Sequence, residues 1–175
     1  MQPKLEKKFT ALNSELKRVL RKTDALDDSA LHRKPDGAWS PVQILYHLLL
    51  SEKGTVGYLN KKLDGNQSIP NSGLGAKLRA FVLRKALRNH GKKFRAPSMV
   101  ANIPEKPDYT EVKTEYLKVR DEMREALEKF DEKMIGQAYF KHPRAGRLNI
   151  LQTVDFLQDH LERHAAQIEE RTQDV

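Results

Sequence analysis

The sequence predicts an all-α protein, a four-helix bundle, and three observations support this fold class. Apolar residues recur with helical spacing in four long segments that are separated by turn-forming residues. No segment alternates apolar and polar residues for long enough to predict a sheet. The length of 175 residues suits one domain with a full core, so residues 1–175 are expected to fold as a single domain.

The first two helices are predicted by different signals. Helical spacing of apolar residues predicts a first helix over residues 5–24. The second helix has a clear start, because Ser40 suits the N-cap position and Pro41 the first helical position. Gln43 can complete a capping box with Ser40. Residues 44–50 are apolar almost all round, so this helix should be buried on more than one side.

A basic segment, residues 66–107, connects the second and third helices. It is predicted to contain an extra amphipathic helix, whose apolar residues are Leu74, Leu78, Phe81, Val82 and Leu87. No Asp or Glu lies between residues 66 and 104, and the eight Lys and Arg there equal the whole difference between 32 basic and 24 acidic residues. The structural interpretation is a solvated helix packed across the bundle with its arginines outside. The functional alternatives are a platform for an anionic substrate or cofactor and, less favoured, a nucleic-acid site, since no groove-reading or stacking motif is present.

The third helix is predicted over residues 108–132 and the fourth over residues 149–171. A short loop at residues 142–146 leads into the fourth helix. The inner side of the third helix is predicted to carry Val112, Leu117, Met123, Leu127 and Phe130.

The composition excludes several classes of protein. The chain has no cysteine, so disulfides, thiolate metal ligands and a cysteine nucleophile are excluded. No stretch approaches the roughly 18 apolar residues that a membrane span needs. The charged start lacks the apolar run of a secretory signal. We therefore expect a cytoplasmic protein without a membrane partner.

Two histidines of the fourth helix are the first candidates for chemistry. His160 and His164 are four residues apart, so both imidazoles project from one face and can bind one metal ion. The zincin protease motif is absent, because no Glu follows His160 directly and Glu162 points away from both rings. On the helical wheel of the fourth helix, the apolar residues form one stripe; His164 falls within this stripe and His160 lies at its edge. The alternative is a half-buried pair satisfied by hydrogen bonds, for example with Gln167 or Asp155.

His47 in the second helix is the third candidate. It lies at the margin of that helix's buried arc, where the structural alternative is a core histidine with one hydrogen bond. Three histidines at stripe margins suit a site at a mouth of the bundle with room for a ligand. Three His and an open position are typical of catalytic metal sites, whereas closed structural sites use four ligands.

Two ordered sets of residues resemble the DinB/YfiT-like superfamily. The first is residues 39–48 followed by Ser51 and Glu52. The second is His142, Pro143 and Gly146, followed by His160, His164 and Gln167. Residues 94–97 also resemble members of this group. The resemblance spans nearly the whole chain and implies an up-down-down-up four-helix bundle, often dimeric, with a metal held by three histidines.

In this sequence the implied metal ligands are His47, His160 and His164. Relatives include metal-dependent transferases that use a low-molecular-weight thiol, such as bacillithiol or mycothiol. A zinc or nickel ion would fit this chemistry, since it lowers the pKa of a bound water to about 7 and can hold a thiol in its nucleophilic form. A chain without cysteine must obtain any such thiol from outside.

Four further residues are assigned candidate roles around the ion. Gln43, one turn before His47, and Gln167, three residues after His164, are candidates for contacts that orient the ligands. Glu52 lies in line with apolar residues and is a weak candidate for a catalytic base; a salt-bridged or rim residue is the favoured interpretation. His142 is interpreted as a loop residue that caps the approach to the fourth helix.

These observations predict a metal-dependent enzyme, a thiol S-transferase or hydrolase. It would transfer a low-molecular-weight thiol or water to a small electrophilic substrate, and we expect a homodimer. The alternative is a non-catalytic metal-binding or stress-response protein. A nucleic-acid-associated protein that uses the basic helix is the least favoured interpretation.

Overall fold

The computed structural model describes residues 1–34, 37–65, 68–89 and 102–172. The helices are α1 (Pro3–Asp24), α2 (Asp28–His32), α3 (Pro41–Leu63), α4 (Leu74–Arg88), α5 (Tyr109–Glu128) and α6 (Ile150–Thr172). Two short strands, β1 (Phe140–His142) and β2 (Gly146–Leu148), form an antiparallel hairpin. The all-α class is confirmed. In the described part of the chain, no helix combines the length and the apolar composition that crossing a membrane requires.

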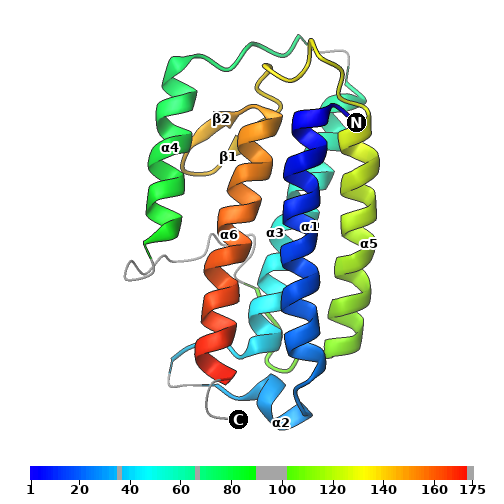
Figure 1. The fold of residues 1–175 in the computed structure, drawn as a ribbon, viewed down its shortest axis with the longest axis vertical. Coiled ribbons are helices and arrows are strands. Elements are labelled where there is room, and N and C mark those ends of the chain that lie inside the picture. Colours follow the sequence, from blue (N-terminus) through cyan, green and yellow to red (C-terminus); the bar gives the residue numbers. More distant parts are fainter. Residues whose placement is uncertain (35–36, 66–67, 90–101, 173–175) are drawn as a thin grey trace.

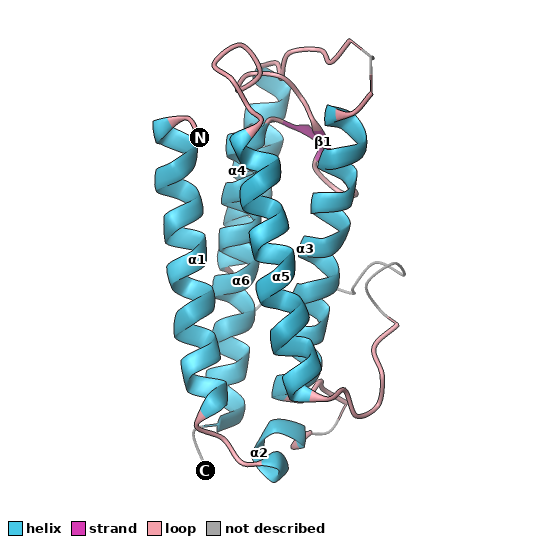
Figure 2. Cartoon of the chain, turned by 90° about the vertical axis from the view of Figure 1, so that its right-hand side faces the viewer, coloured by secondary structure: helices cyan, strands magenta, loops and turns pink. Residues whose placement is uncertain are grey.

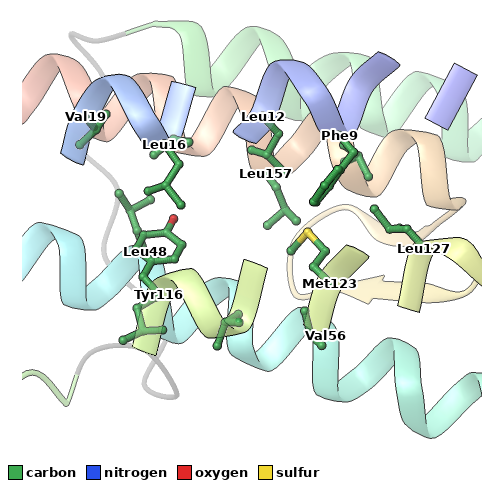
Figure 3. Packing of buried hydrophobic residues seen from close by; sticks show 14 of the residues in the cluster. Phe9, Leu12, Leu16, Val19, Leu48, Val56, Tyr116, Met123, Leu127 and Leu157 are labelled. Carbon is green, nitrogen blue, oxygen red and sulfur yellow. The ribbon is translucent and has the colours of Figure 1, made fainter. Parts of the chain in front are cut away.

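Four long helices lie side by side around one core (Figures 1 and 2). α1 packs on α6 and α3 packs on α5, with further contacts between α3 and α6. In Figure 1, α1 and α6 begin at the end of the molecule where the N-terminus lies, whereas α3 and α5 begin at the opposite end. Figure 3 shows apolar side chains from different helices pointing toward one another, among them Phe9, Leu12, Met123 and Leu157. This packing sets α3 against α6, the two helices that carry the predicted metal ligands.

The helix starts follow the local sequence closely. Ser40 Oγ accepts a hydrogen bond from the Gln43 backbone N–H at 3.4 Å, and the Ser40 N–H donates to Gln43 Oε1 at 3.2 Å, so the predicted capping box is confirmed. The predicted end of α1 at Asp24 is also confirmed. The Asp108 carboxylate caps α5 by accepting from the Glu111 N–H at 2.8 Å.

Two predictions for α5 were wrong. The helix ends at Glu128, four residues before the predicted end, although Phe130 beyond it is still buried. Apolar spacing reports burial, and here the chain leaves the helix while continuing to pack on the core. Leu117 is 39% exposed, and Tyr116 takes the inner position with no exposed surface. The Tyr116 hydroxyl has a buried carboxylate to bind, which a leucine would leave unpaired.

Most of the predicted apolar residues of α4 face solvent, whereas the sequence interpretation expected this helix to pack its apolar side across the bundle. Ala76 and Leu87 are buried, but Leu74, Leu78, Phe81 and Val82 are 58–82% exposed. The arginines Arg84 and Arg88 instead face Asp159 of α6. Arg84 and Arg88 stay 46% and 54% exposed, as the interpretation of a helix with its arginines outside expected, but their Nε atoms also pair with the buried Asp159 carboxylate. The basic residues Lys92, Lys93 and Arg95, and the stretch 94–97 that entered the family resemblance, lie outside the described residues.

Candidate metal centre

The three predicted ligands come from the facing helices α3 and α6. His47 lies in the second turn of α3, and His160 and His164 lie one turn apart in α6. One ring nitrogen from each residue lies within 4.8 Å of those of the other two. The structure therefore brings together all three histidines that the sequence singled out, although His47 is 113 residues away from His160 along the chain.

The distances suit a shared ion. His47 Nε2 and His160 Nε2 are 3.3 Å apart. Two histidine nitrogens that bind one tetrahedral zinc at about 2.0–2.1 Å are separated by about 3.3–3.4 Å. The ring centroids of the three pairs lie 4.7–5.2 Å apart, with the planes steeply inclined to one another. The three ligand nitrogens lie within 4.8 Å of one another, and the His47–His160 pair already has the separation of two ligands of one ion.

Burial keeps the imidazoles of His160 and His164 neutral. His47 and His164 are 4% and 8% exposed, and His160 is half-buried. Desolvation, with the neighbouring His47 as a smaller cause, lowers the pKa of His164 to about 3. Desolvation and the two neighbouring histidines likewise hold the pKa of His160 well below its ordinary value of 6.5. A neutral imidazole is the form that binds a metal, so the site is ready for a cation at neutral pH.

Gln167 fixes the orientation of one ligand. The Nδ1 of His164 lies 2.7 Å from Gln167 Oε1, an oxygen that can only accept, so Nδ1 carries the proton. The lone pair of His164 is then on Nε2, free for a metal. This is the arrangement in which a second residue sets the tautomer of a metal ligand. Asp155, the other partner considered from the sequence, pairs with Lys8 instead.

Gln43 is not brought to the histidines. Its Oε1 completes the capping box of α3, and its Nε2 donates to the backbone oxygens of Pro104 and Glu105 at 2.9 and 3.1 Å. Both ends of the amide are thus used to tie the start of α3 to the connection that precedes α5. The structure supports a fold role for this residue.

Two aromatic rings that the sequence interpretation missed contact the ligands. Trp39, just before the cap of α3, lies 4.9 Å from the His47 ring between centroids. Phe156, one turn before His160, is nearly parallel to that ring at 5.6 Å. Its spacing of four residues from His160 was the available signal. Phe156 also lines a cavity of about 200 Å³ between α4 and α6, so it contacts both His160 and this cavity.

Glu52 is placed away from the histidine group, at the interface of α3 and α5. Its Oε1 accepts hydrogen bonds from the Tyr116 hydroxyl at 2.6 Å and from an Arg120 guanidinium nitrogen at 2.7 Å. Glu52 and Arg120 are both 2% exposed. These contacts support the favoured interpretation of a salt-bridged residue. Desolvation raises the pKa of the Tyr116 hydroxyl well above its ordinary value, so it donates to the carboxylate.

His142 stabilises the turn of the hairpin. Its Nδ1 accepts hydrogen bonds from the backbone N–H groups of Arg144 and Ala145 at 3.1 and 3.0 Å. Desolvation lowers the pKa of His142 to about 4, so the ring stays neutral and keeps accepting these bonds. The ring also packs edge-on against Phe156, with centroids 4.5 Å apart. His142 is thus a loop residue as predicted, but its bonds cap the hairpin turn. The start of α6 is capped by Asn149, whose Oδ1 accepts from the Gln152 N–H at 2.9 Å.

The arrangement defines a class of protein: a helical fold in which three histidines from two facing helices could hold one metal ion. Comparison with protein families matches residues 11–168 to the DinB superfamily. The chain belongs to the DinB superfamily. No curated protein and no solved structure matches it.

Proposed function

We propose that this protein is a metal-dependent enzyme that transfers a low-molecular-weight thiol, or water, to a small electrophilic substrate. The observation that carries the proposal is the convergence of three imidazole nitrogens from His47, His160 and His164 within 4.8 Å. Three imidazole donors without a carboxylate or thiolate favour a borderline ion such as zinc or nickel. When bound, such an ion would supply an open position at which a thiol or water is activated near neutral pH.

The residues of the chain would do the remaining work. Gln167 would hold the His164 ring in its metal-binding tautomer. Trp39 and Phe156 would limit the access of water to the ligands from two sides. The cavity beside Phe156 is lined by Lys77 and Arg84 and also by Asp155 and Asp159, so Lys77 is the cation that it would offer to a carboxylate of the thiol or substrate.

The competing candidate is a non-catalytic metal-binding or stress-response protein. It is favoured by one observation: Glu52, the residue that the sequence suggested as a catalytic base, accepts hydrogen bonds from Arg120 and Tyr116. A metal site without a proton-transferring side chain of its own suits storage, sensing or structural stabilisation. The two candidates share the ion and differ only in turnover.

Two measurements separate these possibilities. Protein purified without an affinity tag is analysed for bound metal, and the loaded protein is then assayed for conjugation of bacillithiol or glutathione to monochlorobimane. An enzyme is expected to lose this conjugation when the metal is chelated and to regain it with zinc or nickel. Bound metal without any metal-dependent conjugation or hydrolysis would favour the non-catalytic candidate, and the absence of bound metal would overturn both.

Several broader assignments belong to the same proposal. The helix directions in Figure 1 support the up-down-down-up order of a DinB-like bundle with α4 as an extra element between α3 and α5. We also propose a single domain and a cytoplasmic homodimer, which sedimentation analysis tests. Nucleic acid is the weakest candidate partner, because α4 turns apolar side chains outward.

A further inference from the structure

α4 exposes an apolar stripe to solvent. Leu74, Leu78, Phe81 and Val82 are 82%, 64%, 61% and 58% exposed. Their spacing of four, three and one residues places them on one face of the helix. The other large apolar side chain that the described residues expose is Leu117 on α5, at 39%. Four such side chains on one helix form a patch, which is a feature of interaction surfaces.

α4 is anchored on α6 by polar contacts, so the stripe cannot turn inward. Asp159 of α6 is 2% exposed and contacts the Arg84 Nε at 3.3 Å and the Arg88 Nε at 2.8 Å. Arg163 of α6 donates to the backbone oxygens of Leu87 and Asn89 at 3.0 and 2.9 Å. Rolling α4 to bury the stripe would leave the Asp159 carboxylate and the Arg163 guanidinium buried without these partners, which is strongly unfavourable.

The helix that carries the stripe is positively charged, and the acidic residues near it include Asp155 and Asp159 of α6, which line a cavity together with Phe81. α4 contains five Lys and Arg and no Asp or Glu. Lys77 and Lys85 are exposed and have no ion-pair partner among the described residues. The side chains of Arg84 and Arg88 remain 46% and 54% exposed beside Asp159. The outward face of α4 thus combines apolar and cationic side chains: Lys85 lies in line with the stripe, and Lys77, Arg84 and Arg88 lie along one side of it.

We propose that this face of α4 docks on the surface of an anionic lipid bilayer. Helices that lie in the membrane interface combine an apolar face with Lys and Arg beside it, and the cations add attraction to acidic headgroups. α4 lies at the outside of the molecule, against α6 (Figure 1), where its exposed side chains can reach a bilayer without a matching groove. The expectation of no membrane partner rested on the absence of a spanning segment, and a peripheral contact needs none.

A second copy of the chain fits this face less well. Two α4 helices packed on each other would bring five positive charges against five. α5 carries Leu117 and many acidic residues, but it lies on the other side of the molecule from α4 (Figure 1). A contact of α4 with the α5 of another copy would be heterologous, that is, head-to-tail. In a dimer of this kind, one α4 face and one α5 face would remain uncovered. The bilayer is therefore the occupant that both the charge and the position favour.

Cosedimentation of the full chain with lipid vesicles tests the proposal. The vesicles are phosphatidylcholine alone or phosphatidylcholine with about a third phosphatidylglycerol, at low and at high salt. We expect binding to the anionic vesicles to be at least about tenfold stronger than to the neutral ones and to weaken as salt screens the charges. Failure to bind anionic vesicles at low salt, or equal binding to both kinds, would overturn the proposal.

Matched variants assign the binding to α4. The double variant Leu78→Ser/Phe81→Ser and the double variant Lys77→Glu/Lys85→Glu are each expected to weaken vesicle binding about tenfold or more. The controls Leu117→Ser and Lys118→Glu make the same chemical changes at exposed positions of α5 and should bind as the original chain does. Circular dichroism and metal content should be unchanged in all four. Equal losses in the controls, or a dimer in solution that only the stripe variant dissociates without any vesicle binding, would contradict the assignment.

Discussion

α3 carries two buried polar clusters that are completed in different ways. His47 meets His160 and His164 of α6, and Glu52, five residues later, meets Arg120 and Tyr116 of α5. The second cluster contains opposite charges 2.7 Å apart, so its members neutralise one another. The first contains three imidazoles whose nitrogens converge, and burial holds His160 and His164 neutral. Such a cluster gains a charged partner only from a bound cation, whereas the ion pair already holds both charges, although Glu52 Oε2 and two Arg120 nitrogens have no hydrogen-bond partner among the described residues.

The largest effect is expected from removing a ligand. His160→Ala and His164→Ala should each abolish stoichiometric metal binding, because the two remaining imidazoles hold an ion far less tightly. Helical content should be nearly unchanged. Elemental analysis of untagged protein and circular dichroism measure the two quantities.

His32→Ala is the control for this experiment. His32 bonds to the backbone oxygens of Asp28 and Pro107 and should not affect the metal. Unfolding of the ligand variants, rather than simple loss of metal, would mean that the histidines act as core residues.

The ion-pair cluster should respond in stability and not in metal content. Arg120→Ala leaves the Glu52 carboxylate buried without its charge partner, and we expect the free energy of unfolding to fall by about 3–5 kcal/mol. Urea denaturation measures this loss. Arg124→Ala, on the half-exposed side of the same helix, should cost less than about 1 kcal/mol. Loss of metal from the Arg120 variant while it remains folded would erase the distinction between the two clusters.

Acid should destabilise the metal-free protein through the histidine cluster. The unfolded chain takes up protons near the ordinary pKa of 6.5, whereas folded His164 does so only near its pKa of about 3. The contribution of His164 to the free energy of unfolding should therefore be constant above pH 6.5. It should fall as the pH drops from 6.5 toward 3. Denaturation at a series of pH values measures the slope. His164→Ala should flatten it, and an unchanged slope would contradict the assignment.

The smallest effect is expected at the residue that orients a ligand. Gln167→Ala should weaken metal binding by about 10–100-fold without abolishing it. Competition with a chelator gives the affinity. Gln158→Ala on the same helix is the control, because the Gln158 amide bonds to Glu162. Equal affinities of the two variants would show that the contact of Gln167 with His164 has no part in binding.

The sequence predicted those features that depend on residues close together in the chain. The capping box of Ser40 and Gln43, the ends of α1 and α6 within a residue or two, and the shared face of His160 and His164 follow from local spacing. α2 and the hairpin were missed because five-residue and three-residue elements are too short to show a period. Gly146, with a φ of 69°, sits where the hairpin needs a left-handed residue, but this requirement appears only once the strands pair.

Contacts between distant segments were predicted less well. His47 was assigned to the site through the position of its side chain on α3 and through family resemblance, and its approach to α6 needed the packed bundle. The partners of Glu52 come from α5, and no local pattern pointed to Tyr116 or Arg120. The outward face of α4 depends on Asp159 of α6, which lies 71 residues from Arg88. Such features are fixed by tertiary packing, which periodicity does not report.

The central claim is that His47, His160 and His164 share one divalent ion. A crystal structure of the untagged protein, grown with zinc or nickel and measured at the absorption edge of that metal, tests it most directly. The account predicts one anomalous peak per chain at about 2.0–2.2 Å from one nitrogen of each ring. A metal-loaded crystal with no peak between the three rings, or with the ion held by other residues, would contradict it.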